Sequence, residues 1–99
     1  MMALPVVFRR IALHEFRDAA NFYAAQRPGL GGEFIREIER CISLVAEQPL
    51  AYPFVHREMR RVITKRFPFS IYFYVETERI VVIAIFHSSR NPTIWRERH

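Results

Sequence analysis

The clearest alternation of apolar and polar positions in this 99-residue chain lies between residues 60 and 87. From residue 69 to residue 75, large apolar residues alternate with Ser and Tyr, and this period of two predicts a β-strand with one apolar face. Residues 79–86 are almost continuously apolar, which is typical of a strand covered on both faces. The polar segment Glu76-Thr77-Glu78 between them predicts an antiparallel hairpin. A further strand, residues 60–67, ends at Pro68, which has no N–H to donate to a ladder.

Ahead of these strands the pattern takes the period of α-helices. Apolar residues between positions 11 and 26 recur at spacings of three and four, namely at Leu13, Phe16, Ala20 and Tyr23. A second helix is predicted from Gly31 or Gly32 to Glu47, and its apolar face consists of Phe34, Ile35, Ile38, Ile42 and Val45. The short segment Arg27-Pro28-Gly29 separates the two helices, so they should form an antiparallel hairpin.

The remaining segments are shorter. Residues 4–8 read as a strand at the edge or start of a sheet, because Pro5 cannot take part in a central ladder. Residues 50–59 read as a loop. Pro92 and Thr93 could open a terminal helical turn that carries Ile94 and Trp95.

The predicted order of elements is strand, helix, helix, strand, strand, strand, which indicates an α+β fold in one domain over residues 1–99. The economical packing lays the helical hairpin on one face of an antiparallel sheet and leaves the other face, with Tyr72, Tyr74 and several arginines, exposed. On the covered face we expect these residues in contact: Leu13, Phe16, Tyr23, Phe34, Ile38 and Ile42 of the helices, and Ile71, Phe73, Val82 and Ala84 of the strands.

Composition excludes several classes of protein. A hydrophobic content of 51% argues against disorder, and the longest apolar run, residues 80–86, is too short to span a membrane. The N-terminus lacks the features of a signal peptide. The single cysteine, Cys41, cannot form an internal disulfide, which fits the reducing cytoplasm. No spacing of His or Cys suggests a metal site, and no cofactor is expected.

The net charge of +5 is distributed unevenly. Residues 1–56 contain six Arg and six acidic residues, whereas residues 57–99 contain nine basic residues and four Glu. All but one of the fifteen basic residues are Arg, whose planar guanidinium suits phosphate or carboxylate. The basic half therefore predicts an acidic partner, either nucleic acid or a protein segment, although charged residues at a sheet edge also deter aggregation.

Cleavage of RNA by its own 2′-hydroxyl would require a base, an acid and cations near the phosphate. An unperturbed histidine side chain titrates near neutral pH, so His87 could be the base or the acid, with Tyr72, Tyr74 or Glu58 as its partner. Alternatively, His87 is a structural hydrogen-bonding residue and the tyrosines form the second face of the sheet. The candidates for a nuclease are Arg61, Arg66, His87 and Arg90.

Three segments carry a resemblance to a known family: PGLGGEFIREIERCISLVAEQP, RRVITKRFPFSIYFYVE and VVIAIFHSSRNPTIWRER. With them the chain resembles the RelE/ParE superfamily of toxins from bacterial type II toxin–antitoxin systems, and within it the ParE-like branch. The resemblance implies a small cytoplasmic toxin that arrests growth and is held inactive by a cognate antitoxin, which is small, acidic and partly disordered. ParE-like members are associated with poisoning DNA gyrase by binding, whereas RelE-like members cut mRNA in the ribosome.

The start of the third strand bears on the choice between a ParE-like and a RelE-like toxin. RelE-like nucleases typically carry an Arg at the start of the third strand, in a pattern like R-L-x-Y, where this chain has Phe69-Ser70-Ile71-Tyr72. The Phe-Pro-Phe-Ser joint is common in the ParE-like branch, so the sequence favours a toxin without chemistry of its own. A ribosome-dependent mRNA endonuclease of the RelE type and a non-toxic relative are the alternatives.

The same reasoning assigns two sets of binding residues. For the target, whether protein or nucleic acid, we expect Arg60, Arg61, Lys65, Arg66, Arg90 and Trp95, although Trp95 could equally cap the core. For the antitoxin we expect Leu13, Phe16, Phe34 and Arg66.

Overall fold

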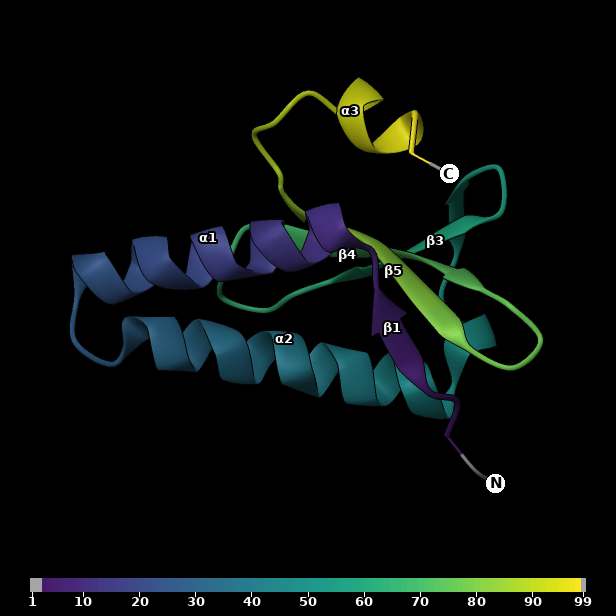
Figure 1. The fold of residues 1–99 in the computed structure, drawn as a ribbon, viewed down its shortest axis with the longest axis horizontal. Helices are drawn as coiled ribbons and strands as arrows, with labels where there is room; N and C mark the ends of the chain where they lie inside the picture. Colours follow the sequence, from purple (N-terminus) through teal and green to yellow (C-terminus); the bar gives the residue numbers. More distant parts are fainter. Residues whose placement is uncertain (1–2, 99) are drawn as a thin grey trace.

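The computed structural model describes residues 3–98 and confirms an α+β fold with a helical hairpin beside a sheet (Figure 1). The predicted strands and helices are all present, with boundaries close to those expected. The elements are β1 (Val6–Phe8), α1 (Arg10–Gln26), α2 (Leu30–Glu47), the 3-10 helix η1 (Pro49–Ala51), β2 (Phe54–His56), β3 (Met59–Ile63), β4 (Phe69–Val75), β5 (Ile80–His87) and α3 (Thr93–Arg96).

The five strands form one sheet in the order β1-β5-β4-β3-β2. Strands β3 to β5 pair antiparallel, as predicted, β2 adds a further antiparallel strand beside β3, and β1 lies at the edge. However, β1 pairs parallel with β5, with Val6 opposite Ile80, so the sheet is mixed rather than purely antiparallel. The helical hairpin between β1 and the remaining strands returns the chain so that β1 and β5 run in the same direction.

The two long helices lie side by side because glycines shape the turn between them (Figure 1). Gly29 has φ +85°, a conformation that L side chains rarely adopt, and it precedes α2 directly. At Gly31 a Cβ atom would lie 2.8 Å from the backbone oxygen of Ala20 and 2.9 Å from Cβ of Ala24. Only glycine therefore permits this close approach of α2 to α1.

The first core, which we call the helix-facing cluster, lies between the helical hairpin and the sheet. Phe34, Ile38, Ile71, Phe73 and Val82 are fully buried there, as the sequence predicts. Three further predicted residues, Phe16, Tyr23 and Ile42, are partly buried and pack against this cluster. Leu13, which was also predicted, is half-buried and lies outside it.

The prediction that Ala84 faces the helices is wrong. Tyr72 pairs with Ala84, but the next residue, Phe73, pairs with Val82, so β5 carries one extra residue, Ile83. Such a bulge breaks the strict alternation of faces. Ile83 and Ala84 both face away from the helices as a consequence.

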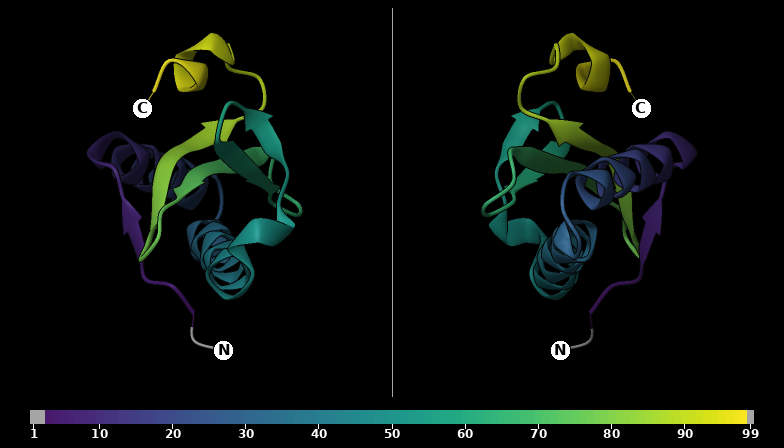
Figure 2. Two further views of the ribbon diagram at one scale, coloured as in Figure 1. Left: turned by 90° about the vertical axis from the view of Figure 1, so that its right-hand side faces the viewer. Right: turned by 90° about the vertical axis from the view of Figure 1, so that its left-hand side faces the viewer.

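The face of the sheet opposite the helices is largely covered, contrary to the expectation from sequence, although Tyr74 remains half-buried. The C-terminal segment covers it (Figure 2). Trp95 stacks on Tyr72 with ring centroids 4.0 Å apart, and Tyr72 retains only 6% of its exposure. We call this second core the C-terminal cluster; its buried members are Met59, Tyr72, Ile83, Ala84, Phe86 and Trp95.

Two segments differ from the sequence-based assignment. The predicted loop over residues 50–59 contains η1 and the short strand β2. The strand predicted over residues 60–67 ends at Ile63, because Thr64 turns the chain: its hydroxyl lies 2.8 Å from the backbone oxygen of Phe67 and 3.1 Å from that of Phe69. Within residues 3–98 no helix combines the length and apolar character that crossing a membrane requires.

Candidate functional site

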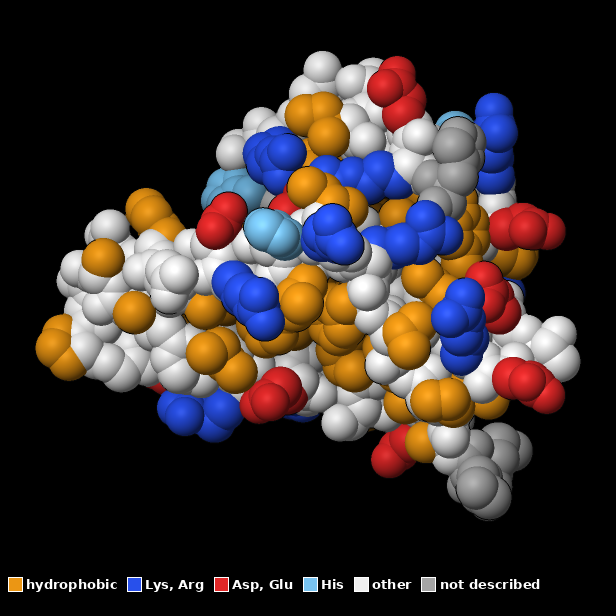
Figure 3. Space-filling model, viewed as in Figure 1, with side chains coloured by type: hydrophobic (Ala, Val, Ile, Leu, Met, Phe, Trp, Pro, Cys, Tyr) orange, Lys and Arg blue, Asp and Glu red, His pale blue; other side chains and the backbone are white. Residues whose placement is uncertain are grey.

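The basic residues that the sequence analysis selected lie in three places. In Figure 3 most Lys and Arg side chains on the visible face lie over the sheet and the C-terminal segment. The sequence-predicted residues divide among strand β3 (Arg60 and Arg61), the β3–β4 turn (Lys65 and Arg66) and the segment after β5 (Arg90), with His87 at the end of β5 itself.

The β3–β4 turn is attached to helix α2 through carboxylates. Arg66, at φ +70°, places its Nη2 atom 2.7 Å from Oε1 of Glu33, and this hydrogen bond lowers the pKa of Glu33. The backbone N–H of Lys65 donates to Oε2 of Glu37 at 2.5 Å. The positive charge of Arg66 is therefore balanced within the protein.

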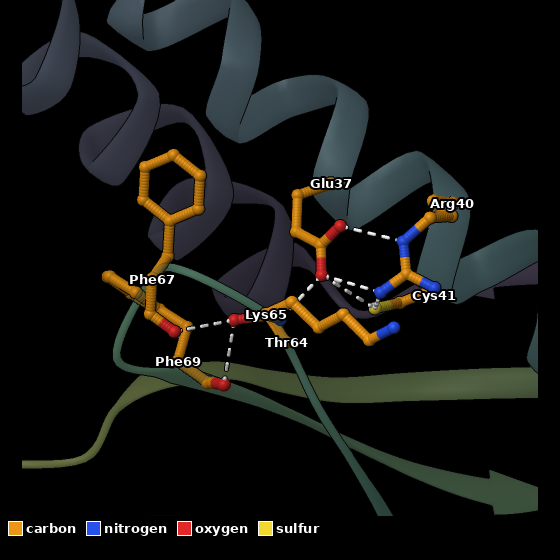
Figure 4. Close-up of polar contacts among 7 residues, drawn as sticks. All are labelled: Glu37, Arg40, Cys41, Thr64, Lys65, Phe67 and Phe69. Carbon is orange, nitrogen blue, oxygen red and sulfur yellow. Dashed lines mark hydrogen bonds and ion pairs between the residues drawn. The ribbon is translucent and has the colours of Figure 1, made fainter.

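Glu37 is the centre of this attachment (Figure 4). Its two carboxylate oxygens accept hydrogen bonds of 2.7 Å from Nε and Nη2 of Arg40, in addition to the bond from Lys65. The bonds from Arg40, together with that from Lys65, lower the pKa of Glu37 to about 2. Burial raises the pKa of the neighbouring thiol, Cys41, to about 11, so the thiol stays protonated and unreactive at neutral pH.

The stability of the protein should therefore depend on pH through Glu37. Its pKa in the folded state, about 2, is below the ordinary value of 4.5, so the ionised form stabilises the fold above pH 4.5 and this contribution is lost as the pH falls toward 2. Urea unfolding should show Glu37→Gln less stable than the parent at neutral pH, with the difference shrinking between about pH 5 and pH 2. A difference that stays constant over this range would contradict the role of the Glu37 charge.

The C-terminal segment is attached to α1 by Glu15, a residue that the sequence reasoning missed. Oε2 of Glu15 accepts from Arg90 at 2.7 Å and from Arg98 at 2.9 Å, and Oε1 accepts from Arg98 at 2.8 Å. Oε1 also accepts the backbone N–H of Ile85, at 3.2 Å. No local pattern could have indicated this site, because Glu15 and Arg98 are 83 residues apart.

His87 has structural partners. Its Nδ1 atom lies 3.0 Å from the backbone nitrogen of Ser89 and 2.7 Å from the Ser89 hydroxyl, and its ring meets the edge of Phe69 with centroids 5.2 Å apart. Phe69 and Ser70, which stand where a RelE-like nuclease has an arginine, are each only 9% exposed. Within residues 3–98 no side-chain hydrogen bond or ion pair connects any two of the four nuclease candidates, and the one backbone bond among them runs from the N–H of Arg90 to the oxygen of His87, at 3.1 Å.

Arg60 and Arg61 differ from Arg66 and Arg90 in having no carboxylate partner among the described residues. Nη1 of Arg60 donates to the backbone oxygen of Tyr52 at 2.5 Å, and its guanidinium lies 3.9 Å from the ring centroid of Phe54. Arg61 is half-buried and pairs with Tyr72 in the ladder. Both guanidinium groups are therefore without an ion pair in the described part of the chain.

An apolar groove of about 350 Å³ lies between α1, α2 and β1, and its apolar walls are Phe8, Phe16, Ile38 and Ile42. Figure 3 shows apolar side chains at this position, between the two helices. Of the residues predicted to contact an antitoxin, Phe16 lines the groove, whereas Phe34 is 0% exposed and lies beneath the surface. Trp95, predicted to contact the target, is 4% exposed and caps the core, as its alternative interpretation held.

Comparison with known proteins identifies the family to which the chain belongs. Residues 6–92 match the family described as the ParE toxin of the type II toxin–antitoxin system, parDE. The chain therefore belongs to the ParE toxin family, which confirms the resemblance seen in its sequence. No curated protein sequence matches the chain. Its fold is shared with a chain from the chromosomal ParDE toxin–antitoxin system of P. aeruginosa, at a TM-score of 0.75 and 17% identity, covering 86% of this chain and 96% of that one.

Proposed function

We propose that this ParE-family toxin arrests growth in the cytoplasm by binding DNA gyrase, without catalysing a reaction of its own. The observation that carries the proposal is that the side chains of three candidate nuclease residues are bound to different partners within the protein. Arg66 is held by Glu33 on α2, Arg90 by Glu15 on α1, and His87 by Ser89. Cations that stabilise the transition state of phosphoryl transfer must instead converge on one phosphate.

A binding mechanism suits the surface. Arg60, Arg61 and Lys65 have no carboxylate partner for their side chains among the described residues, and they lie on one strand and the turn that follows it. Arginine can grip carboxylate or phosphate through its planar donors. Trp95 would support this surface from beneath, by holding the C-terminal segment on the sheet, rather than contact the target itself.

The partner that neutralises such a toxin is, in this proposal, a small acidic antitoxin that is partly disordered when free. The apolar groove lined by Phe16, Ile38 and Ile42 is suited to the apolar face of a helix that folds on binding. The positive charge of residues 57–99 would attract an acidic chain over a distance and would accelerate its association.

The test is to measure supercoiling by gyrase in the presence of the purified protein and, in parallel, the integrity of mRNA on translating ribosomes. We expect supercoiling to be inhibited and transcripts to stay intact. The variant His87→Gln should keep most of its ability to arrest growth in cells without antitoxin. If transcripts are cut and His87→Gln is harmless, the protein is an endonuclease of the RelE type; if expression without antitoxin is harmless, it is a non-toxic relative.

A further inference from the structure

The positive charge of residues 57–99 is only partly available to a partner. Four of its arginines are ion-paired within the protein: Arg66 with Glu33, Arg79 with Glu76, and Arg90 and Arg98 with Glu15. Among residues 3–98, the basic residues of this half whose side chains have no ion pair are Arg57, Arg60, Arg61, Lys65 and Arg96. Three of these five belong to the β2–β3 hairpin, so the arginines without an ion pair are concentrated there.

A cleft of about 620 Å³ opens beside this hairpin, at the edge of the sheet where Figure 1 places β2 and β3. Arg57 and Arg60 line it together with Arg9, and its apolar walls include Leu50, Phe54 and Tyr74. Leu50 is 69% exposed and Phe54 is 58% exposed. No other large hydrophobic side chain within residues 3–98 is as exposed as that of Leu50. Exposed apolar side chains beside arginines and aromatic rings are typical of the centres of protein–protein interfaces.

The backbone of Arg57 supports a binding role. Arg57 has φ +53°, in the left-handed region, at the tight turn that joins His56 to Met59. A non-glycine residue there costs on the order of 1 kcal/mol, and glycine, asparagine or aspartate would suit the turn better. Strain of this kind persists mainly where a side chain has a function. The turn holds a guanidinium at the mouth of the cleft in spite of this cost.

The chemistry of the cleft favours a protein over a nucleic acid. Glu58 and Glu76 also line it, and their charges would repel the continuous row of phosphates in a nucleic-acid backbone. A protein segment can instead place one carboxylate at the arginines and keep other positions apolar. We propose that this cleft binds a segment of a partner protein in which an acidic residue contacts Arg57 and Arg60 and an apolar residue packs on Phe54 and Leu50.

This inference rests on the proposed function for its biological setting, because the partner would be the toxin's target. It also shifts the expected contact from Arg66 and Arg90, whose charges are balanced internally, to Arg57 and Arg60. The cleft itself can be tested without gyrase.

The probe is a displayed library of short random peptides, selected against the purified full-length protein. We expect the selected peptides to combine Asp or Glu with Leu, Phe or another large apolar residue. The variant Arg57→Gly should weaken their binding at least about tenfold, a loss of about 1.4 kcal/mol, while its thermal stability is unchanged or raised because glycine relieves the positive φ. A residue with a purely structural role would not show this combination.

The matched control is Arg66→Gly, which also replaces an arginine at positive φ but lies outside the cleft. It should leave peptide binding within about twofold of the parent, whereas Arg60→Gln should weaken it as Arg57→Gly does. Equal binding by Arg57→Gly and the parent overturns the proposal, as does selection of peptides without acidic residues. Tighter binding of an RNA or DNA oligonucleotide that depends on Arg57 also overturns it.

The gyrase supercoiling assay then distinguishes the proposed function from the proposed peptide-binding cleft. If the parent protein does not inhibit supercoiling, the proposed function fails, but peptide binding that depends on Arg57 still supports the cleft. If the parent inhibits supercoiling and Arg57→Gly inhibits equally at every concentration, the cleft is not the contact with the target and this inference is wrong.

Discussion

Replacing Phe34 by alanine is expected to lower the free energy of unfolding by about 3–5 kcal/mol. Phe34 is fully buried, and its ring lies 5.0 Å from that of Phe69, 5.2 Å from that of Phe67 and 5.2 Å from that of Tyr23, centroid to centroid. It therefore connects both long helices with the β3–β4 turn and β4. Truncation would remove these contacts and leave a cavity that this closely packed hairpin cannot close.

The matched control is Phe22→Ala. Phe22 lies on α1 but is 59% exposed, so its loss should change the free energy of unfolding by less than about 0.5 kcal/mol. Urea unfolding of the two variants and the parent, followed by circular dichroism, measures both values. Similar losses for Phe34→Ala and Phe22→Ala would show that the helix-facing cluster is not the main source of stability.

Glu15→Ala is expected to have an effect of similar size, about 3–5 kcal/mol, because it removes one partner of an ion pair that is largely buried. The Glu15 side chain is 10% exposed and that of Arg98 15%, so the charge of Arg98 would remain largely buried without a carboxylate, with the backbone oxygen of Ile83 as its remaining acceptor. The backbone N–H of Ile85 would also lose its acceptor. The C-terminal segment should then loosen from the sheet.

Trp95 reports this loosening directly, because it is the single tryptophan of the chain. Its fluorescence emission should shift to longer wavelength in Glu15→Ala as the ring leaves Tyr72 and meets water. The control is Arg79→Ala, which breaks an exposed ion pair with Glu76 and should cost less than about 1 kcal/mol. An unchanged emission spectrum together with a loss as small as that of the control would refute the structural role of Glu15.

Most helices and strands could be predicted because their apolar residues recur with a clear period. Strand β4 begins and ends where its alternation does, at Phe69 and Val75, and α2 follows directly on the turn at Gly29. These features depend on local sterics and on one buried face, which neighbouring residues specify. Strand β2 was missed because its three residues, next to Pro53, are too few to show a period.

Features that depend on distant parts of the chain were not predictable. The bulge at Ile83 interrupts a run that is apolar on both faces, so a change of register leaves no trace in the pattern. The covering of Tyr72 by Trp95 required knowledge of where the tail returns. The sequence shows that the excess of positive charge lies in residues 57–99. It does not show which arginines have an acidic partner within the protein, since Arg66 and its partner Glu33 are 33 residues apart.

The parallel pairing of β1 with β5 has a consequence for synthesis on the ribosome. The two long helices can form as soon as they emerge, because their contacts are local. However, Val6 can pair only once Ile80 has been synthesised, and Glu15 only once Arg98 has been, so the edge strand β1 and the C-terminal segment take their places late. The domain therefore completes its fold only after Arg98 has been synthesised. A chain that terminates ahead of β5 is a helical hairpin with an uncovered apolar face, a substrate for proteases rather than a shortened toxin.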